Sequence, residues 1–555
     1  MKRTLSALAL CALPLGVLVA PVSADPAASV QLVRDSTPGN ALSGVGEGVA
    51  LGSRLVYSYY DGAAHGWEPW ISDGTAAGTM LIRDLYPGAG DSQIGDLTAY
   101  HGRVYFRATD GVHGNELWVT DGTAAGTTML VDAVPGANGS DAGENLIRVA
   151  GDTLYFVADT VSNDDQLWKT DGTVAGTKVV ALIGTPAVGG NIGQLAPWGN
   201  KLLFQADDGV HGSEPWVSDG TAVGTKMIKD LDTTASSAPW RFTTLGSRFV
   251  FSARPTGGNP ELWVSDGTAA GTAPVPGTTS SWPDQLVANN GHVLYSASDG
   301  AGDELWTSDG TTASRLKDIN PGAGSGAIQA MTVFNGRVFF GASDASGNNE
   351  LWTSDGTAAG TTKVRDIATT GGSYPAHFLA LGSTLFFEAQ ADATGYELWR
   401  TDGTGAGTAL VADILPGATG SYAQPLAAVG GTLFFEAEEA THGQELWSYS
   451  TLAPAPVAHG STTAAQARKQ YSRAAARKKR IYVTVTVRAA GTTPTGTVLL
   501  KKGSVTIGRA TLAGGTARVR ITKRLIRRTT RIVAVYGGSA EVTGSQSAVV
   551  RIRLR

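Results

Sequence analysis

Acidic residues in a repeated turn are the first candidates for chemistry in this chain. Eight copies of Asp-Gly-Thr begin at Asp73, Asp121, Asp171, Asp219, Asp266, Asp309, Asp355 and Asp402. Such loops could bind Ca²⁺, but each supplies one carboxylate where Ca²⁺ takes about 6–8 oxygen ligands. The pattern favours a turn in which Asp accepts hydrogen bonds from the backbone that follows it. We therefore expect no cofactor, with calcium as the alternative.

Two further polar positions recur along the chain. A Glu stands two residues before a repeated Trp at Glu68, Glu116, Glu214, Glu261, Glu304, Glu350, Glu397 and Glu445, and Gln166 replaces it once. At one equivalent loop position, four repeats carry His-Gly, at His65, His113, His211 and His442. Equivalent residues on separate repeats cannot meet at one metal or one reacting bond. We expect the Glu side chains to accept hydrogen bonds within each repeat and the His residues to form turns.

Aromatic residues occupy a position that otherwise varies between repeats. When the repeats are aligned on the Ala that ends the second strand, the loop before the first strand carries Gln93, Gly143, Asn191, Ala238, Trp282, Ala327, Tyr374 and Tyr422. Trp240 lies two residues after Ala238. Exposed rings on neighbouring repeats suit stacking on sugar faces or anchoring a protein. The candidate ligand-binding residues are therefore Trp240, Trp282, Tyr374 and Tyr422, unless each ring covers only the end of its own repeat.

A basic run near the C-terminal segment is the last candidate. It comprises Arg468, Lys469, Arg473, Arg477, Lys478, Lys479 and Arg480. Attraction to an anionic wall polymer or acidic polysaccharide is one interpretation, and a merely solvated charge run is the other. Nucleic acid is not expected, because aromatic residues are scarce there and the chain begins with an export signal. No nucleophile elbow, phosphate loop or zinc-protease motif is present, so no catalytic residue is assigned.

The elements that must position these residues follow from a fixed period. Trp recurs at Trp70, Trp118, Trp168, Trp216, Trp263, Trp306, Trp352, Trp399 and Trp447. Successive Trp residues are 43 to 50 positions apart, and a period of this length indicates propeller blades or stacked arrays. Each unit contains four short strand patterns separated by Gly-rich turns, as in one blade. The sequence predicts an all-β propeller of about nine four-stranded blades, or eight with one degenerate unit, since the usual range is about four to eight.

The first and last repeats are complementary halves. Residues 31–39 match the tail of a repeat, whereas residues 445–450 match its front without the Asp-Gly-Thr and the fourth strand. The N-terminal strand should complete the last blade and close the ring, leaving no open sheet edge. The Trp alternates with apolar neighbours on the other face of its strand, so we expect it to pack between blades.

The repeated phrase resembles a known family. Glu350-Leu351-Trp352-Thr353-Ser354-Asp355-Gly356-Thr357 is the fullest copy, and eight copies keep [Ser/Thr]-Asp-Gly-Thr. It resembles the ELWxxDGT repeat of exported bacterial proteins over residues 28–450. The resemblance implies a β-propeller-like repeat protein and carries over no catalytic residue.

A second domain follows. Residues 451–480 are rich in Ala, Thr, Pro and basic residues and read as a linker, partly helical in its second half. Residues 481–555 contain six strand patterns, which indicate a small β-sandwich. Pro494-Thr495-Gly496-Thr497-Val498 and Ala534-Val535-Tyr536-Gly537-Gly538 resemble bacterial Ig-like repeat domains. That resemblance implies a spacer or an adhesive stalk.

Charge and the N-terminal segment indicate the cell exterior. Residues 1–24 read as a signal peptide with Lys2 and Arg3 before an apolar stretch, and the propeller is expected over 25–450. The sole cysteine, Cys11, lies in that signal. Residues 25–450 carry a formal net charge of −27, and residues 451–555 carry one of +20. No other stretch is apolar for long enough to cross a bilayer, so a secreted or loosely surface-associated protein is expected.

Three functions remain open at this point. The leading hypothesis is a non-enzymatic scaffold that binds an extracellular polysaccharide or protein through a propeller face, with the basic Ig-like module as spacer or anchor. The first alternative is an extracellular glycan hydrolase or lyase with a site in the propeller channel, which a cluster of non-repeated acids would favour. The second alternative is a purely structural surface protein.

Overall fold

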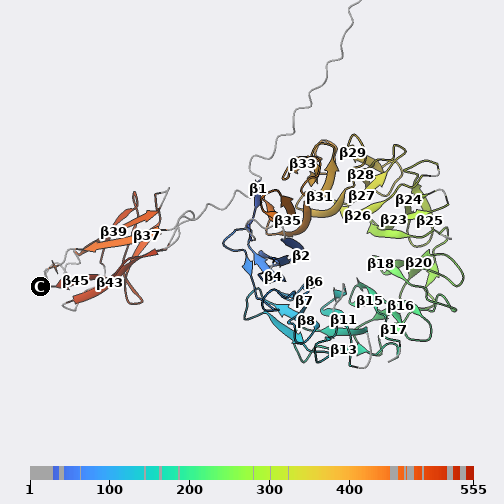
Figure 1. The fold of residues 1–555 in the computed structure, drawn as a ribbon, viewed down its shortest axis with the longest axis horizontal. Helices are drawn as coiled ribbons and strands as arrows, with labels where there is room; N and C mark the ends of the chain where they lie inside the picture. The colour runs from blue at the N-terminus through green and yellow to red at the C-terminus, as the bar shows by residue number, and fades with distance from the viewer. Residues whose placement is uncertain are drawn as a thin grey trace, which may run out of the picture. The chain divides into compact units, whose positions relative to one another are not determined.

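All regular elements in the described part of the chain are β-strands (Figure 1). The computed structural model describes residues 29–36, 43–62, 64–142, 146–161, 165–185, 188–278, 281–300, 302–322, 324–450, 461–467, 470–471, 481–489, 493–521, 529–537 and 545–554. The predicted signal peptide and Cys11 lie outside these residues. Two units are compact, Met1–Thr451 and Leu452–Arg555. Within the described ranges no helix is long and apolar enough to span a membrane.

Unit 1 is built from nine four-stranded antiparallel sheets. The first three contain β2 (Gly44–Leu51), β3 (Arg54–Tyr60), β4 (Trp67–Ser72) and β5 (Met80–Leu81); β6 (Gly95–Tyr100), β7 (Arg103–Thr109), β8 (Asn115–Thr120) and β9 (Thr128–Val131); and β10 (Ile147–Ala150), β11 (Thr153–Ala158), β12 (Gln166–Thr170) and β13 (Lys178–Ala181). The next three contain β14 (Gly193–Trp198), β15 (Lys201–Asp207), β16 (Ser213–Ser218) and β17 (Lys226–Met227); β18 (Trp240–Leu245), β19 (Arg248–Ala253), β20 (Glu261–Ser265) and β21 (Ala273–Pro274); and β22 (Asp284–Asn289), β23 (His292–Ser298), β24 (Asp303–Ser308) and β25 (Ala313–Lys317).

The last three sheets bring the two ends of unit 1 together. They contain β26 (Gln329–Phe334), β27 (Arg337–Ser343), β28 (Asn349–Ser354) and β29 (Thr362–Arg365); β30 (Ala376–Leu381), β31 (Thr384–Ala391), β32 (Gly395–Thr401) and β33 (Ala409–Ala412); and β34 (Gln424–Val429), β35 (Thr432–Glu439), β36 (Gly443–Ser450) and β1 (Ser29–Leu32). In this sheet β1 pairs antiparallel with β36, with Ser29 opposite Ser450 and Leu32 opposite Trp447. The strand that the predicted half-repeat lacked is thus supplied from the other end of the unit.

The sheets contact one another through their first strands. These strands, β2, β6, β10, β14, β18, β22, β26, β30 and β34, each contact the next one along the chain, and β34 also contacts β2. Figure 1 shows the sheets of unit 1 following one another around a common centre. Their meander is the topology of a propeller blade. The sheet of β18–β21 is also four-stranded, although its last strand, β21, has only two residues.

The repeated Trp packs between sheets. Trp118 of β8 is 4% exposed and belongs to the same hydrophobic cluster as Val56 and Ile71 of the preceding sheet. The Arg83 guanidinium, which follows β5, lies 6.0 Å from the Trp118 ring and donates to the Thr127 carbonyl oxygen at 2.7 Å. Similar cation–ring contacts join Arg34 to Trp70, Lys317 to Trp352 and Arg365 to Trp399. Apolar packing and a basic side chain therefore hold adjacent sheets together.

The Asp-Gly-Thr segments form the predicted turns. In the copy at Asp121, the Asp Oδ1 accepts from Thr123 N at 2.9 Å and from Thr123 Oγ1 at 2.7 Å. These hydrogen bonds lower the pKa of Asp121. A Cβ on Gly126 would stand 2.1 Å from the same Asp121 oxygen, which explains the second repeated glycine. Each Asp is thereby committed to its own turn.

The repeated Glu accepts hydrogen bonds within its repeat, as expected. Buried Glu214 accepts from Leu231 N at 2.9 Å, from Ser237 N at 3.0 Å and from Ser237 Oγ at 2.7 Å. Burial raises the pKa of Glu214, and these donors oppose that shift. Glu116, Glu350 and Glu397 have the same kinds of donor. This position therefore links the third strand to the segment that enters the next sheet.

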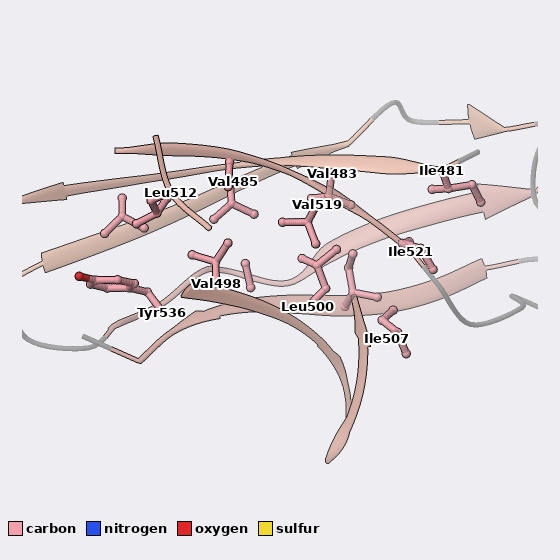
Figure 2. Close-up of a cluster of buried hydrophobic side chains, with 14 of the residues drawn as sticks. Ile481, Val483, Val485, Val498, Leu500, Ile507, Leu512, Val519, Ile521 and Tyr536 are labelled. Atoms are coloured by element: carbon pink, nitrogen blue, oxygen red, sulfur yellow. The ribbon is translucent and has the colours of Figure 1, made fainter. Parts of the chain in front are cut away.

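Unit 2 is a sandwich of two sheets. One contains β37 (Ser461–Ala467), β39 (Tyr482–Ala489) and β42 (Thr516–Arg520), and the other β38 (Gln470–Tyr471), β45 (Val550–Leu554), β43 (Thr529–Tyr536), β40 (Thr497–Lys502), β41 (Val505–Thr511) and β44 (Ser545–Gln546). Figure 2 shows Val483, Val485 and Val519 facing Val498 and Leu500 across the core. Alternating apolar residues on each strand supply this core, as predicted.

The linker prediction for residues 451–480 needs a correction. Residues 461–467 form β37, which pairs with β39 along its whole length. Ala465 and Ala467 pack against the core of unit 2. Strand β37 reads Ser-Thr-Thr-Ala-Ala-Gln-Ala, which contains no Val, Ile or aromatic residue and therefore gives a weak strand signal. The remaining residues of this stretch are outside the described ranges, apart from Gln470–Tyr471.

Candidate ligand-binding face

Non-repeated residues gather where each loop enters the next sheet. At this point the loop residue has a left-handed backbone at Gln93, Asp141, Asn191, Ala238, Trp282, Ala327, Tyr374 and Tyr422, with φ between 41° and 51°. Gly143, which the alignment placed in this set, lies outside the described residues, and Asp141 takes the conformation instead. The loop also bonds to the residue before the repeated Glu, as in Tyr422 N to Tyr396 O at 3.0 Å. We call the loop positions with this left-handed backbone, together with the positions directly before the repeated Glu, the rim.

The aromatic candidates differ in exposure. Trp282 is 52% exposed, Tyr374 44% and Tyr422 43%, whereas Trp240 is half-buried at the start of β18. A left-handed backbone suits glycine and is unfavourable for a bulky side chain. The backbone geometry therefore gives no reason for Trp or Tyr at these positions.

Two of these candidates belong to a cluster of three tyrosines that sequence reasoning found only in part. The Tyr396 and Tyr422 rings stack with centroids 5.4 Å apart and planes at 19°. Tyr374 N donates to the Asn349 carbonyl oxygen at 3.2 Å. This is the same backbone hydrogen bond that Tyr422 N donates to the Tyr396 carbonyl oxygen in the next repeat. Burial and the negative charge of Glu388 raise the pKa of Tyr396, with smaller contributions from Tyr374 and Tyr422. The cluster spans two neighbouring sheets.

A pair of non-repeated acids lies beside the cluster. Glu388 on β31 and Glu436 on β35 occupy the same position in adjacent sheets and are 5% and 7% exposed. His377 Nδ1 lies 2.9 Å from Glu388 Oε2, and Gln444 Nε2 donates to Glu436 Oε2 at 3.2 Å. Burial, followed by the charge of Glu388, raises the pKa of Glu436 to about 7, which His377 opposes. Glu436 can therefore exchange a proton near neutral pH.

The acid pair predicts a pH-dependent stability. Because the pKa of Glu436 is higher in the folded state, its ionisation destabilises that state, and the loss develops from about pH 4.5 to about pH 7. Glu436→Gln removes this ionisation. The free energy of unfolding of the variant, relative to that of the parent, should therefore be higher at pH 8 than at pH 4.5 by about 1–3 kcal/mol. Denaturant unfolding at both pH values measures it. The exposed neighbour Glu438→Gln is the control, and an equal change in both variants would contradict the account.

The other sequence candidates fall elsewhere. All seven basic candidates, Arg468, Lys469, Arg473, Arg477, Lys478, Lys479 and Arg480, lie outside the described residues. His113 and His211 form turns, because each ring nitrogen Nδ1 lies 2.8 Å from the Asp three residues earlier. In the described part of the chain, no group of three or more His, Cys, Asp or Glu side chains is placed to hold a metal ion.

Comparison with known protein families identifies only the C-terminal module. Residues 450–554 match the bacterial Ig-like domain (group 3). The match begins before β37 and agrees with the inclusion of that strand in unit 2. No curated protein matches the chain.

Several solved structures match part of the chain at low identity. The computationally designed Ika8 protein is 17% identical, with a TM-score of 0.38, over 64% of this chain and 96% of its own. A prolyl endopeptidase is 10% identical, with a TM-score of 0.39, over 72% of this chain and 54% of its own. The β-propeller domain of the Trilobed protease from Pyrococcus furiosus is 12% identical, with a TM-score of 0.32, over 58% of this chain and 98% of its own. This chain thus spans about half of the endopeptidase.

Proposed function

We propose that this protein is an exported, non-enzymatic scaffold that binds an extracellular polysaccharide through the rim. The observation that carries the proposal is the stacked pair of Tyr396 and Tyr422, with the exposed Tyr374 in the loop that enters the sheet of Tyr396. Aromatic faces stack on the apolar faces of sugar rings, and nearby carboxylates accept hydrogen bonds from sugar hydroxyls. Trp282 is exposed before β22 and Trp240 starts the first strand of the preceding sheet, so they offer further aromatic points for a long chain. A protein ligand is the alternative occupant.

The scaffold in this proposal is a closed propeller of nine blades. Its support is the pairing of β1 with β36, the nine four-stranded sheets, and the contact of β34 with β2. Membership of residues 28–450 in the ELWxxDGT repeat family belongs to the same proposal. A closed ring would fix the rim residues of different blades at constant separations, which lowers the entropy lost on binding a long ligand.

A glycan array probed with the full-length protein tests the proposal. The expected result is binding to a restricted group of polysaccharides, lost in the double variant Tyr374→Ala, Tyr422→Ala and in Trp282→Ala, Tyr374→Ala. The matched control is Tyr374→Phe, Tyr422→Phe, which keeps the rings and should keep most of the signal. If the alanine variants bind as well as the parent, the tyrosine cluster and Trp282 are not the site. Absence of any bound glycan would favour a protein ligand or a purely structural role.

The acid pair favours a second candidate function, an extracellular glycan hydrolase. Glycoside hydrolysis uses one protonated and one ionised carboxyl group. Glu436, whose pKa is raised to about 7, and Glu388, within reach of His377, are the residues present for those two roles. Incubation of array-positive glycans with the protein should release no reducing ends if binding is the function. Release that is abolished in both Glu388→Gln and Glu436→Gln would establish the enzyme instead.

The basic C-terminal segment is proposed to hold the protein on anionic wall polymers. Residues 451–555 carry a formal net charge of +20. Salt weakens the attraction of exposed charges, because they are screened over about 10 Å at 0.1 M. Removal of residues 451–555 should therefore abolish retention on an anionic resin at low salt, and salt should elute the full-length protein. The stretch 25–450, with its formal net charge of −27, should pass through. Retention of the truncated protein would contradict the proposal.

A further inference from the structure

A pocket of about 420 Å³ lies at the rim between the sheet of β2–β5 and the sheet of β6–β9. Its polar lining residues are Glu47, Ser58, Asp91, Gln93 and Arg107, and its aromatic wall is Trp67. Trp67 stands at the position before the repeated Glu, as Tyr396 does in its own sheet. Ser58 and Arg107 stand at the position of Glu388 and Glu436, each opposite the residue that follows the repeated Glu. The pocket is thus made from non-repeated residues, although its framework is repeated.

Glycines create the room for the Trp67 ring. Gly44, Gly46 and Gly48 alternate along β2, where side chains would otherwise project. A Cβ on Gly46 would stand 2.4 Å from Ser58 Oγ and 3.1 Å from Trp67 Cζ3, and one on Gly44 would stand 3.1 Å from Trp67 Cη2. Since the ring lies against the backbone of β2, one wall of the pocket is a half-buried indole face.

Arg107 is the unusual member of the lining. It is half-buried, and its Nε is shielded from solvent with no hydrogen-bond partner. Among the residues that the structure describes, no hydrogen bond or ion pair involves its guanidinium, although Glu47 and Asp91 line the same pocket. Glu47 instead accepts from Leu97 N at 3.1 Å, and Asp91 accepts from Gln93 N at 2.7 Å. The buried Nε donor is unsatisfied, which is unfavourable, and the acceptor oxygen of an anion would satisfy it.

We infer that this pocket binds a carboxylated sugar ring, a uronic acid residue of an extracellular polysaccharide. The sugar carboxylate would pair with the Arg107 guanidinium, whose fork of N–H donors fits a carboxylate in two parallel hydrogen bonds. The ring would stack on Trp67, and its hydroxyls would donate to Glu47 and Asp91. These two acids disfavour an anion that offers only acceptor oxygens, such as sulfate, because their carboxylates need donors and the sugar hydroxyls supply them. The inference does not depend on the tyrosine cluster.

Titration of the full-length protein with methyl β-glucuronoside and methyl β-glucoside tests the inference. The two probes share the ring and differ at one carbon, which carries a carboxylate in the first and a hydroxymethyl group in the second. We expect the glucuronoside to bind at least about tenfold more tightly, a difference that one paired charge can supply. Arg107→Gln should remove that preference, Arg107→Lys should retain part of it, and Trp67→Ala should weaken both probes. The melting temperature of each variant checks folding.

Three outcomes would overturn the inference. The first is equal affinity for the two probes, and the second is an unchanged preference in a folded Arg107→Gln variant. The third is loss of glucuronoside binding in Tyr374→Ala, Tyr422→Ala but not in Arg107→Gln, which would place the ligand at the tyrosine cluster and leave the proposed function standing. Conversely, a preference for the glucuronoside that depends on Arg107 and persists in the Tyr374→Ala, Tyr422→Ala variant supports this pocket. That support holds even if the glycan array assigns no role to the tyrosine cluster.

Discussion

Removal of residues 25–40 is expected to destroy the cooperative unfolding of unit 1. The deletion takes away β1 and Val33, which is buried against Val45 and Leu55. It also removes Arg34, which contacts Trp70 and the Thr79 carbonyl oxygen of the neighbouring sheet. The exposed edge of β36 would then be free to pair with other chains. We expect aggregation or a large fall in melting temperature, measured by calorimetry and size-exclusion chromatography.

A shorter truncation provides the control. Deletion of residues 25–28 leaves β1 intact and should leave the melting temperature unchanged. Arg34→Ala should have an intermediate effect, since it keeps the strand but loses the contact to Trp70. A monomeric protein with an unchanged melting temperature after the longer deletion would show that the pairing of β1 with β36 does not stabilise unit 1.

Substitution of a repeated Trp should have the largest effect of any single change. Trp352 is 7% exposed and lies in the cluster with Leu294, Leu305 and Phe340, which come from two adjacent sheets. Trp352→Ala should lower the free energy of unfolding by about 3–5 kcal/mol, because it removes a buried ring and leaves a cavity. Trp118→Ala should behave in the same way. Denaturant unfolding measures both.

The matched control is Trp282→Ala. Its ring is half exposed and should contribute little to stability, within about 0.5 kcal/mol. If Trp352→Ala melted normally but failed to bind the glycan, the repeated Trp would belong to the binding site and not to the core.

Sequence alone predicts the repeated features because they arise from local chemistry repeated many times. The turn at Asp121, the hydrogen bonds of Glu214 and the packing of Trp118 each recur at a fixed period, so one copy explains the others. The half-repeat at residues 31–39 likewise predicts the partner of β36. The linker boundary was wrong at 461–467, since Ala and Thr give no distinct strand pattern.

The non-repeated residues are harder to predict because their significance depends on which sheets become neighbours. Glu388 and Glu436 are 48 residues apart and share one position in two repeats, so the period that locates the Trp could also have located them. Tyr396 and Trp67 stand directly before the repeated Glu, at another position where the sequence varies. A search for variation at fixed repeat positions would have found both sets. Exposure, the unpaired Arg107 and the raised pKa of Glu436 required the folded structure.

Calorimetric titration of the best glycan from the array into three proteins tests the central claim most directly. The claim is that repeated positions build the scaffold and that the tyrosine cluster binds the ligand. Tyr374→Ala, Tyr422→Ala should lose at least about tenfold in affinity while keeping the parent melting temperature, since exposed stacked rings contribute to binding more than to folding. The parent and the Tyr374→Phe, Tyr422→Phe variant should bind alike. Unchanged affinity in the alanine variant, with its fold intact, would contradict the account.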